Sequence, residues 1–357
     1  MKLGIFSTQF EMGHVANGIS NNAYLTARYM EKKGFDVEVF APRFKGMEKS
    51  EQHGKVKINR FDIRLVSDIT YFSFGVMKEA TKRNFDLIHS FHYGYFPASV
   101  GLRTSSKLGI KHFLTPTFHN VQTSFVKSAL FSLYNKTEGK KILSKSFVLP
   151  YNEDEADQLK KISKFKYNVV PSPIDNGIFF PRKTQSDKMT ILYVGAMTPW
   201  KGARIAFDIC KEIEKTHKDI IFKFVGSGPL ESLKHGAGKN FIFMKDLSLR
   251  DLANEFRNAD IFLYPTAYES FGRVAAEAMM SGVPVVTTDV GAMPETVGSG
   301  GLTVKYGDWA SMRENLMRLI ETTAARKKLR TSAIKHSRQF QWETVGKNIY
   351  KIYNKNA

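Results

Sequence analysis

Cysteine is scarce in this sequence: Cys210 is the only one among 357 residues. A single cysteine excludes an internal disulfide bond and any metal site built from several thiolates. Cys210 lies in a helix-like stretch rich in isoleucine, so we expect a buried structural thiol. This cysteine usage favours a cytoplasmic protein.

Long hydrophobic runs are also missing. No stretch reaches the ~20 apolar residues that a helix needs to cross a membrane. The first residues lack the small-residue cleavage pattern of a signal peptide, and we interpret them as a β-strand. The hydrophobic content of 42% is enough for a full core, and the length predicts two domains of roughly 100–200 residues each.

Acidic residues are outnumbered, with 34 Asp and Glu against 53 Lys and Arg, which gives a net charge of +19. This charge indicates an anionic partner: nucleic acid, an anionic membrane face or a phosphorylated substrate. A basic surface that only keeps the protein in solution is the other interpretation. The sequence contains no RNA-binding or zinc-finger signature, so composition alone does not choose among these partners.

Short β-rich runs alternate with amphipathic helices along the whole chain. Most of the runs are continuously apolar, which is typical of parallel strands covered by helices on both faces. The alternation predicts βαβ units, and hence two doubly wound α/β domains. The expected strands are residues 2–6, 36–40, 86–89, 112–115, 146–149, 190–194, 220–225, 260–264 and 283–287.

Helix ends and the domain boundary are visible in the local sequence. Residues 20–33 predict a helix that ends before Gly34. Asn152 and Glu155 predict a capping box, so the acidic run there marks a helix start and not a metal site. Proline density rises near the middle of the chain. We therefore expect domains at residues 1–175 and 176–340, with a terminal segment at 341–357.

Two strand-to-helix loops in the second half carry candidate chemistry. The strand at 190–194 runs into Gly195, then Lys201 and a helix. Open α/β sheets bind ligands at such strand ends, and a helix N-terminus attracts phosphate. Lys201 would add a full positive charge. A plain turn with an exposed lysine is the alternative.

The second loop follows the strand at 260–264 and contains two carboxylates. Glu269 lies in the loop, where a carboxylate can hold sugar hydroxyls. Glu277 lies eight residues later on a helix that begins near Phe271, about two turns along, where it can accept hydrogen bonds from a ribose diol. Because the helix is otherwise small and apolar, Glu277 needs a partner. Two carboxylates at this spacing also occur by chance.

These residues carry a resemblance to a known family. The block from Glu269 to Glu277, followed by residues 281–295, resembles the donor-site signature of family-4 retaining glycosyltransferases of the GT-B fold. Further stretches at 86–89, 115–119, 195–202, 224–230 and 340–353 are similar to the same family. The resemblance spans nearly the whole chain. It implies two Rossmann-like domains facing a cleft, with a terminal helix that crosses back to the first domain.

The resemblance also implies an activity: transfer of a hexose from a UDP- or GDP-sugar to an acceptor, with retention of configuration and without a metal or other cofactor. Glu269 would hold the transferred sugar, His119 would face it, and Lys201 would neutralise the diphosphate. Glu277 would hold the ribose. The remaining donor-binding positions would be Gly18, Gly195, Gly226, Lys245, Leu247, Phe271, Gly272 and Arg273.

One departure from the family pattern concerns the diphosphate. The family often has arginine directly after the glycine of the phosphate loop, and this chain has Ala196 there. Arg204 or Arg273 are the candidate replacements. The departure and the charge favour an alternative: a non-catalytic protein on the same scaffold that binds anionic ligands or nucleic acid. An epimerase or phosphorylase is a further alternative.

Histidines offer no convincing metal site. His89, His92, His112 and His119 cluster in the sequence, but they show no HExxH-like spacing. The chain also lacks an Asp-x-Asp motif. We therefore expect His89 to be a hydrogen-bonded group at a strand end.

The segment from Phe125 to Lys145 mixes apolar and basic residues at helical spacing. A basic amphipathic helix can lie on an anionic membrane surface, whereas a core-facing helix with a solvated face is the other interpretation. Membrane contact would favour a lipid-linked or glycolipid acceptor and a peripheral position on the inner membrane face. The apolar residues would be Phe125, Leu130, Phe131 and Tyr134, and the basic ones Lys127, Lys136, Lys140, Lys141 and Lys145.

Overall fold

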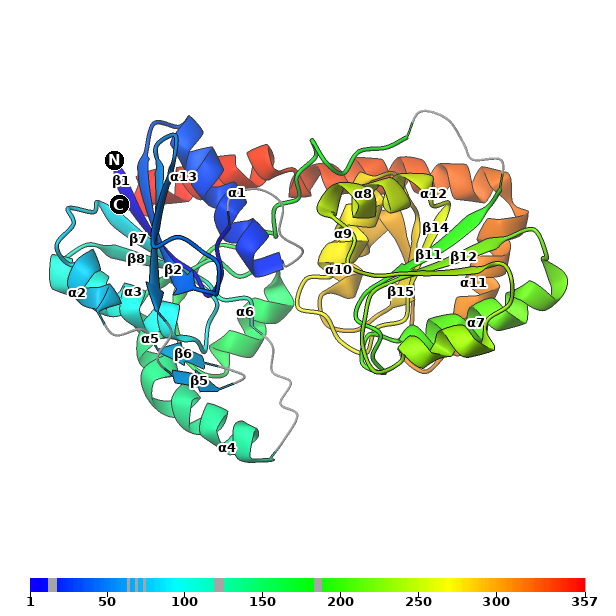
Figure 1. The fold of residues 1–357 in the computed structure, drawn as a ribbon, viewed down its shortest axis with the longest axis horizontal. Helices are drawn as coiled ribbons and strands as arrows, with labels where there is room; N and C mark the ends of the chain where they lie inside the picture. Colours follow the sequence, from blue (N-terminus) through cyan, green and yellow to red (C-terminus); the bar gives the residue numbers. More distant parts are fainter. Residues whose placement is uncertain are drawn as a thin grey trace. The chain divides into compact units, whose positions relative to one another are not determined.

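The computed structural model describes residues 1–11, 18–62, 65–67, 70–72, 75–118, 125–182 and 188–356. These residues form two compact units (Figure 1). Unit 1 comprises Met1–Pro173 together with Trp342–Ala357, and unit 2 comprises Ile174–Gln341. The last helix therefore belongs to the first domain, although unit 2 precedes it in the sequence.

Unit 1 contains an eight-stranded sheet of order β10-β9-β8-β7-β1-β2-β4-β3. Its strands pair in parallel, except that β3 runs antiparallel to β4. The strands are β1 (Lys2–Phe6), β2 (Asp36–Arg43), β3 (Ser50–His53), β4 (Val56–Asp62), β7 (Leu87–Phe91), β8 (Lys111–Thr115), β9 (Phe147–Val148) and β10 (Lys166–Tyr167). A separate antiparallel pair is formed by β5 (Leu65–Ser67) and β6 (Thr70–Phe72).

The structure confirms the five strands expected in the first half of the chain, as β1, β2, β7, β8 and β9. Strand β4 was not predicted, although buried and partly exposed residues alternate along it. The polar strand β3 was not predicted, because SEQH has no apolar alternation. The helices of unit 1 are α1 (Gly18–Lys32), α2 (Val76–Ala80), α3 (Phe96–Leu108), α4 (Phe125–Tyr134), the π-helix η1 (Asn135–Gly139), α5 (Lys140–Lys145), α6 (Glu153–Lys160) and α13 (Trp342–Asn356).

Helix α13 lies beside α1 and closes the core of unit 1 (Figure 1). Trp342 packs edge-on against Tyr29 of α1, with the ring centroids 6.2 Å apart. At the other end of the helix, the Tyr353 hydroxyl lies 2.6 Å from Nδ1 of His89 on β7. Apolar packing and one buried polar contact thus attach the C-terminal helix to the first sheet.

Unit 2 is built on a six-stranded parallel sheet of order β13-β12-β11-β14-β15-β16. The strands are β11 (Thr190–Val194), β12 (Ile221–Val225), β13 (Phe241–Met244), β14 (Ile261–Tyr264), β15 (Val285–Thr288) and β16 (Gly301–Val304). The main helices are α7 (Ala203–Thr216), α8 (Leu249–Asn258), α9 (Arg273–Met280), α10 (Met293–Val297), α11 (Trp309–Glu321) and α12 (Thr323–Ser337). Short 3-10 turns are η2 (Glu231–Gly236), η3 (Gly298–Gly300) and η4 (Arg338–Phe340).

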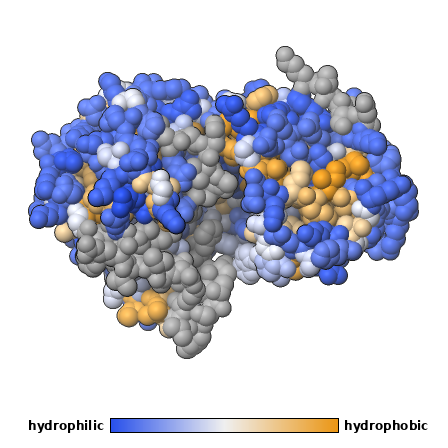
Figure 2. All heavy atoms as spheres, viewed as in Figure 1, coloured by the Kyte–Doolittle hydropathy of each residue, from blue (hydrophilic) through white to orange (hydrophobic). Residues whose placement is uncertain are grey.

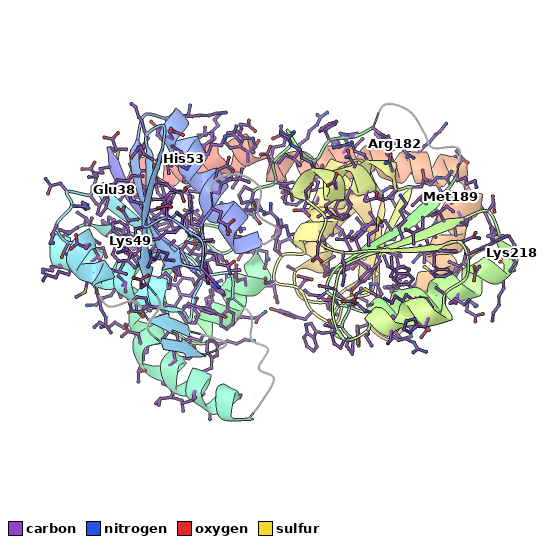
Figure 3. All side chains as sticks on the ribbon, in the orientation of Figure 1. Glu38, Lys49, His53, Arg182, Met189 and Lys218 are labelled. Carbon is purple, nitrogen blue, oxygen red and sulfur yellow. The ribbon has the colours of Figure 1, made fainter. Side chains whose placement is uncertain are left out.

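An ion pair fixes the chain where it enters unit 2. Arg182, labelled in Figure 3, places Nη2 2.6 Å from Oδ1 of Asp260. The other oxygen of Asp260 accepts the backbone N–H of Thr190 at 2.9 Å. Because both groups are largely buried, this arrangement sets the start of β11 beside the start of β14.

Both expectations of doubly wound α/β architecture are confirmed. If the strands of unit 2 are numbered along the chain, they lie side by side in the order 3-2-1-4-5-6, which is the order of dinucleotide-binding sheets. The winding reverses between β11 and β14. In such sheets a ligand binds outside the carboxyl ends of the strands at the point of reversal. The loops that follow β11 and β14 are therefore the candidate binding site.

Candidate functional site

The loop after β11 carries Lys201 and is shaped by glycines. The N–H of Gly195 donates to the carbonyl of Val225 at 3.0 Å, which keeps the loop next to β12. Gly202 adopts a left-handed φ of 73° directly before α7. A Cβ there would lie 2.0 Å from the carbonyl oxygen of Pro265, so only glycine fits. Lys201 therefore lies at the mouth of α7, beside the end of β14.

The loop after β14 brings Glu269 to Lys201. Nζ of Lys201 lies 2.5 Å from Oε1 of Glu269, and the hydroxyl of Tyr264 donates to the same oxygen. Glu269 is only 8% exposed. Its backbone carbonyl accepts the N–H of Ala292 at 3.0 Å. Two residues that the sequence separates widely therefore form one ion pair at the reversal point of the sheet.

Helix α9 begins directly after this loop. Gly272 precedes it with a left-handed φ of 79°, and a Cβ there would lie 2.5 Å from the sulfur of Met293. The adjacent Phe271 packs edge-on against Phe340, with centroids 5.4 Å apart. We expected the helix to begin near Phe271, and the structure starts it at Arg273.

Glu277 lies inside α9 and has the partner that its position requires. Nε of Arg273, one turn earlier, lies 2.8 Å from Oε1 of Glu277. Burial raises the pKa of Glu277, and the guanidinium of Arg273 opposes this effect. A carboxylate that is 3% exposed is thus held in a helix whose N-terminus carries a cation.

A glycine turn after β12 lies against the loop of Gly195. Gly226 has a φ of 148°, and a Cβ on it would lie 1.9 Å from the carbonyl oxygen of Gly195. The N–H of Gly226 donates to Met244 at 2.9 Å. Lys245 and Leu247 follow β13 at the same edge of the sheet, and Lys245 is exposed whereas Leu247 is half-buried.

The structure separates the two arginines that could replace the cation missing at Ala196. Arg204 is exposed on α7, where its Nε pairs with Asp208 at 2.8 Å. Arg273 is mostly buried and stands in the first turn of α9, next to the Glu269 loop. Position favours Arg273, since cations near the site act at short range.

Two of the predicted site residues, Gly18 and His119, belong to unit 1. Gly18 is the first residue of α1, and His119 lies outside the described residues. The residue before it, Phe118, donates its N–H to Oε1 of Glu155 at 2.5 Å. The side chain of Asn152 accepts the N–H of Glu155 at 2.8 Å, which confirms the predicted N-cap of α6.

Glu155 does not behave as a simple capping-box residue. Its Oε2 accepts the N–H of Tyr151, one residue before the cap, at 2.6 Å. Burial raises the pKa of Glu155 to about 8, although the N–H groups of Phe118 and Tyr151 favour its charged form. The carboxylate therefore ties the segment after β8 to the start of α6.

The histidines of the sheet are hydrogen-bonded side chains in the core. His89 lies between the Tyr353 hydroxyl and Oγ1 of Thr115, at 2.6 and 2.9 Å. His112 lies between the hydroxyls of Ser146 and Ser90, at 2.7 and 2.9 Å. Burial lowers the pKa of both histidines to about 3, so both are neutral at pH 7. Within the described part of the chain, no three His, Cys, Asp or Glu side chains come together as metal ligands.

Helix α4 faces the protein differently from our expectation. Phe131 and Tyr134 pack against the apolar cluster around Tyr93, so they are not available to an interface. Leu130 is exposed as expected, at 63%, and Leu133, which was not among the expected residues, is exposed at 60%. Figure 2 shows apolar surface at this helix. The side chains of Phe125 and Lys127 lie outside the described residues.

Two residues of the site were missed in the sequence. Tyr264 ends β14 and bonds Glu269, and the hydroxyl of Tyr193 on β11 lies 3.0 Å from the carbonyl of Ala196 and 3.1 Å from that of Lys201. A tyrosine in an otherwise apolar buried strand needs a partner for its hydroxyl. That signal was present in both strands.

Comparison with known proteins agrees with this architecture. Residues 16–176 match Glycosyltransferase Family 4, and residues 176–336 match the glycosyl transferases group 1. The chain is 30% identical over 279 residues to an uncharacterised glycosyltransferase of Methanocaldococcus jannaschii, with 75% of each chain covered. It is 29% identical over 171 residues to a phosphatidyl-myo-inositol mannosyltransferase of Mycobacterium leprae, with 46% of each covered.

Solved structures share the fold over the whole chain. Sucrose-phosphate synthase from Thermosynechococcus elongatus superimposes with a TM-score of 0.78 at 19% identity, covering 99% of this chain and 98% of that one. HepE of Anabaena in complex with UDP-glucose gives 0.76 at 16% identity, covering 99% and 100%. The fold is that of the GT-B glycosyltransferases.

The two family matches cover the two units in turn, and together they account for nearly the whole chain. The protein belongs to the family-4, group 1 glycosyltransferases, and it is a glycosyltransferase. Among its described residues, no helix is both long and apolar enough to span a membrane.

Proposed function

We propose that this protein is a retaining hexosyltransferase that takes a sugar from a UDP- or GDP-sugar without a metal ion. The observation that carries the proposal is the ion pair of Lys201 and Glu269 at the reversal point of the unit 2 sheet. A cation there neutralises the leaving diphosphate, and a carboxylate beside it accepts hydrogen bonds from sugar hydroxyls.

The residues around the pair suit the other parts of such a donor. The α7 and α9 helices both begin at this edge, so their N-termini favour a phosphate group. Glu277 offers a carboxylate for the ribose, and Lys245 and Leu247 flank the position of the base. Arg273 adds positive charge where Ala196 supplies none. HepE, which shares the fold, was solved with UDP-glucose, and this supports a nucleotide sugar here.

The chemistry assigned to the chain is electrostatic and positional. Lys201 stabilises the negative charge that develops on the leaving phosphate. Glu269 orients the transferred sugar. Because the sugar is already oriented when it binds, less entropy is lost in reaching the transition state. His119 of unit 1 would act on the acceptor side. The family resemblance supports retention of configuration and metal independence.

We further propose an acceptor at a membrane surface, lipid-linked or a glycolipid. Leu130 and Leu133 stand exposed on α4, and four exposed lysines follow within the same helical segment: Lys136, Lys140, Lys141 and Lys145. Apolar side chains next to lysines favour the interface of an anionic bilayer. The similarity to a phosphatidyl-myo-inositol mannosyltransferase supports this acceptor class. The protein would then act peripherally at the cytoplasmic face.

A thermal-shift screen with UDP-glucose, UDP-galactose, GDP-mannose and their nucleoside diphosphates tests the donor. Binding to the folded state raises the unfolding midpoint. We expect a shift with one nucleotide series, and a loss of that shift in Lys201→Ala. The matched control is Lys223→Ala, which breaks a partly buried ion pair with Glu255 (2.6 Å) in the same unit. A screen in which no nucleotide shifts the wild type would overturn the proposal.

A further inference from the structure

Two buried tyrosines lie beneath the Lys201–Glu269 pair. Tyr193 is on β11 and Tyr264 ends β14, on either side of the reversal point. Their ring centroids are 6.1 Å apart. Both are among the most completely buried large side chains of the described chain. Because a buried hydroxyl without a partner is costly, the direction of each hydroxyl is informative.

The two hydroxyls serve the two loops of the site separately. The Tyr193 hydroxyl lies between the carbonyls of Ala196 and Lys201, at 3.0 and 3.1 Å. It therefore fixes the backbone that presents Lys201. The Tyr264 hydroxyl donates to Oε1 of Glu269, so it fixes a carboxylate and not a backbone.

We propose that Tyr264 is a positioning residue that keeps the Glu269 carboxylate aimed at the donor sugar after Lys201 has turned to the diphosphate. This inference rests on the proposed function. Sugar transfer then depends on the Tyr264 hydroxyl, which gives the tyrosine at the end of β14 a role. Tyr193 has a different role, because it supports the loop of Lys201.

The need for a second partner follows from the ion pair itself. Lys201 is the partly exposed member of the pair, and its side chain is long and flexible. A diphosphate carries more charge than a carboxylate, so it competes for the ammonium group. Glu269 is nearly buried, and a buried carboxylate that loses its donors is strongly destabilised. A hydrogen-bond donor that stays in place when Lys201 leaves removes that cost.

Tyr264 meets the requirements for such a hydrogen-bond donor. Its ring stacks on Phe262, with centroids 5.6 Å apart, and its carbonyl accepts the hydroxyl of Thr287 at 2.7 Å. Burial raises the pKa of Tyr264 well above its usual value, so the phenol stays protonated and can donate. The side chain is thus held by packing on one side and by the backbone on the other.

The arrangement also leaves one carboxylate oxygen for the sugar. Every hydrogen bond found between the described residues and the Glu269 side chain goes to Oε1. With Oε1 held by Tyr264, the second oxygen Oε2 is the acceptor that remains for sugar hydroxyls. The role of Tyr264 is therefore to fix the orientation of Glu269.

The test compares Tyr264→Phe with Tyr193→Phe. Tyr264→Phe keeps the ring and removes only the hydroxyl. We expect kcat to fall roughly 10- to 100-fold, as for a lost hydrogen bond to a charged group. Binding of UDP or GDP, whichever the protein accepts, stays within about twofold of wild type because no diphosphate contact changes. Tyr193→Phe should instead weaken binding of the nucleoside diphosphate, because the Tyr193 hydroxyl supports the loop that carries Lys201. Tyr306→Phe, at an exposed tyrosine of unit 2, changes neither quantity.

A binding cycle separates the roles without turnover. The ratio of the dissociation constants of UDP and UDP-glucose, or of GDP and GDP-mannose, reports the contribution of the sugar. Tyr264→Phe and Glu269→Gln should each reduce this contribution, and the double variant should reduce it no further than Glu269→Gln alone. Additive losses, or an unchanged kcat in a folded Tyr264→Phe variant, overturn the positioning role. Full turnover in Glu269→Gln would instead overturn the proposed function itself.

Discussion

Nε of Arg273 lies 2.8 Å from Oε1 of Glu277, across one turn of α9. The pair places a cation at the start of α9, next to the candidate donor site, and an acid one turn further along the helix. It explains how an acid as buried as Glu277 is accommodated in an apolar helix. It also places a positive charge near the proposed diphosphate site, in a chain that has Ala196 where the family often has an arginine.

Arg273 should therefore be necessary for binding the nucleoside diphosphate. We expect Arg273→Ala to weaken UDP or GDP binding about tenfold or more, as for the loss of a charge-assisted hydrogen bond. Adding Ala196→Arg to this variant should restore much of the affinity, since it returns a cation to the phosphate loop. Isothermal titration calorimetry measures both effects. Arg204→Ala is the control, and equal effects of the two arginine variants would contradict the assignment.

The buried histidines predict acid sensitivity. Burial lowers the folded-state pKa of His89 and His112 to about 3, whereas the unfolded chain titrates near the ordinary value of about 6.5. Between these values only the unfolded state takes up protons. The stabilisation is therefore complete above about pH 6.5 and is lost as the pH falls, by about 2 kcal/mol per histidine at pH 5.

Urea unfolding at pH 7 and pH 5 checks this prediction. The free energy of unfolding of His112→Gln should depend less steeply on pH than that of wild type, because one of the two groups is removed. His53→Gln is the matched control, because His53 is exposed on β3 (Figure 3). A wild-type slope that His112→Gln leaves unchanged would show that His112 is not the group that takes up the proton.

The exposed leucines of α4 predict binding to anionic vesicles. Replacing Leu130 and Leu133 together by glutamine should weaken binding to phosphatidylcholine vesicles containing phosphatidylglycerol about tenfold, because two apolar side chains no longer enter the bilayer. Co-sedimentation measures the bound fraction. Met77→Gln, at an exposed apolar residue elsewhere in unit 1, should have no effect. Wild-type protein that stays in the supernatant with these vesicles would count against membrane contact.

Much of this fold could be read from the sequence because parallel strands are continuously apolar. The strand at 190–194 matches β11 in both bounds, and the expected strand at 36–40 falls inside β2. In the large sheet of unit 1, β3, β4 and β10 were not predicted. SEQH and KY carry no apolar pattern, and their pairing depends on neighbours brought together by the fold.

Part of the candidate site could be predicted from the sequence for a similar reason. The two loops with Lys201 and Glu269 follow strong strands, so their place at one sheet edge could be expected. The direct contact between the two side chains could not, because it depends on strand order, and strand order is set by tertiary packing. The exposed face of α4 was predicted only in part: Leu130 is exposed as expected, but Phe131 and Tyr134 pack against the core. Apolar residues one position apart point in different directions, and only packing decides which are buried.

The most direct test of the whole account is the release of nucleoside diphosphate from the sugar nucleotide that the protein binds, measured for Glu269→Gln and Glu255→Gln. Both variants neutralise an acid that pairs with a lysine in unit 2. The account predicts wild-type release by Glu255→Gln and release at least about 100-fold slower by a folded Glu269→Gln variant. Equal rates in the two variants would contradict it.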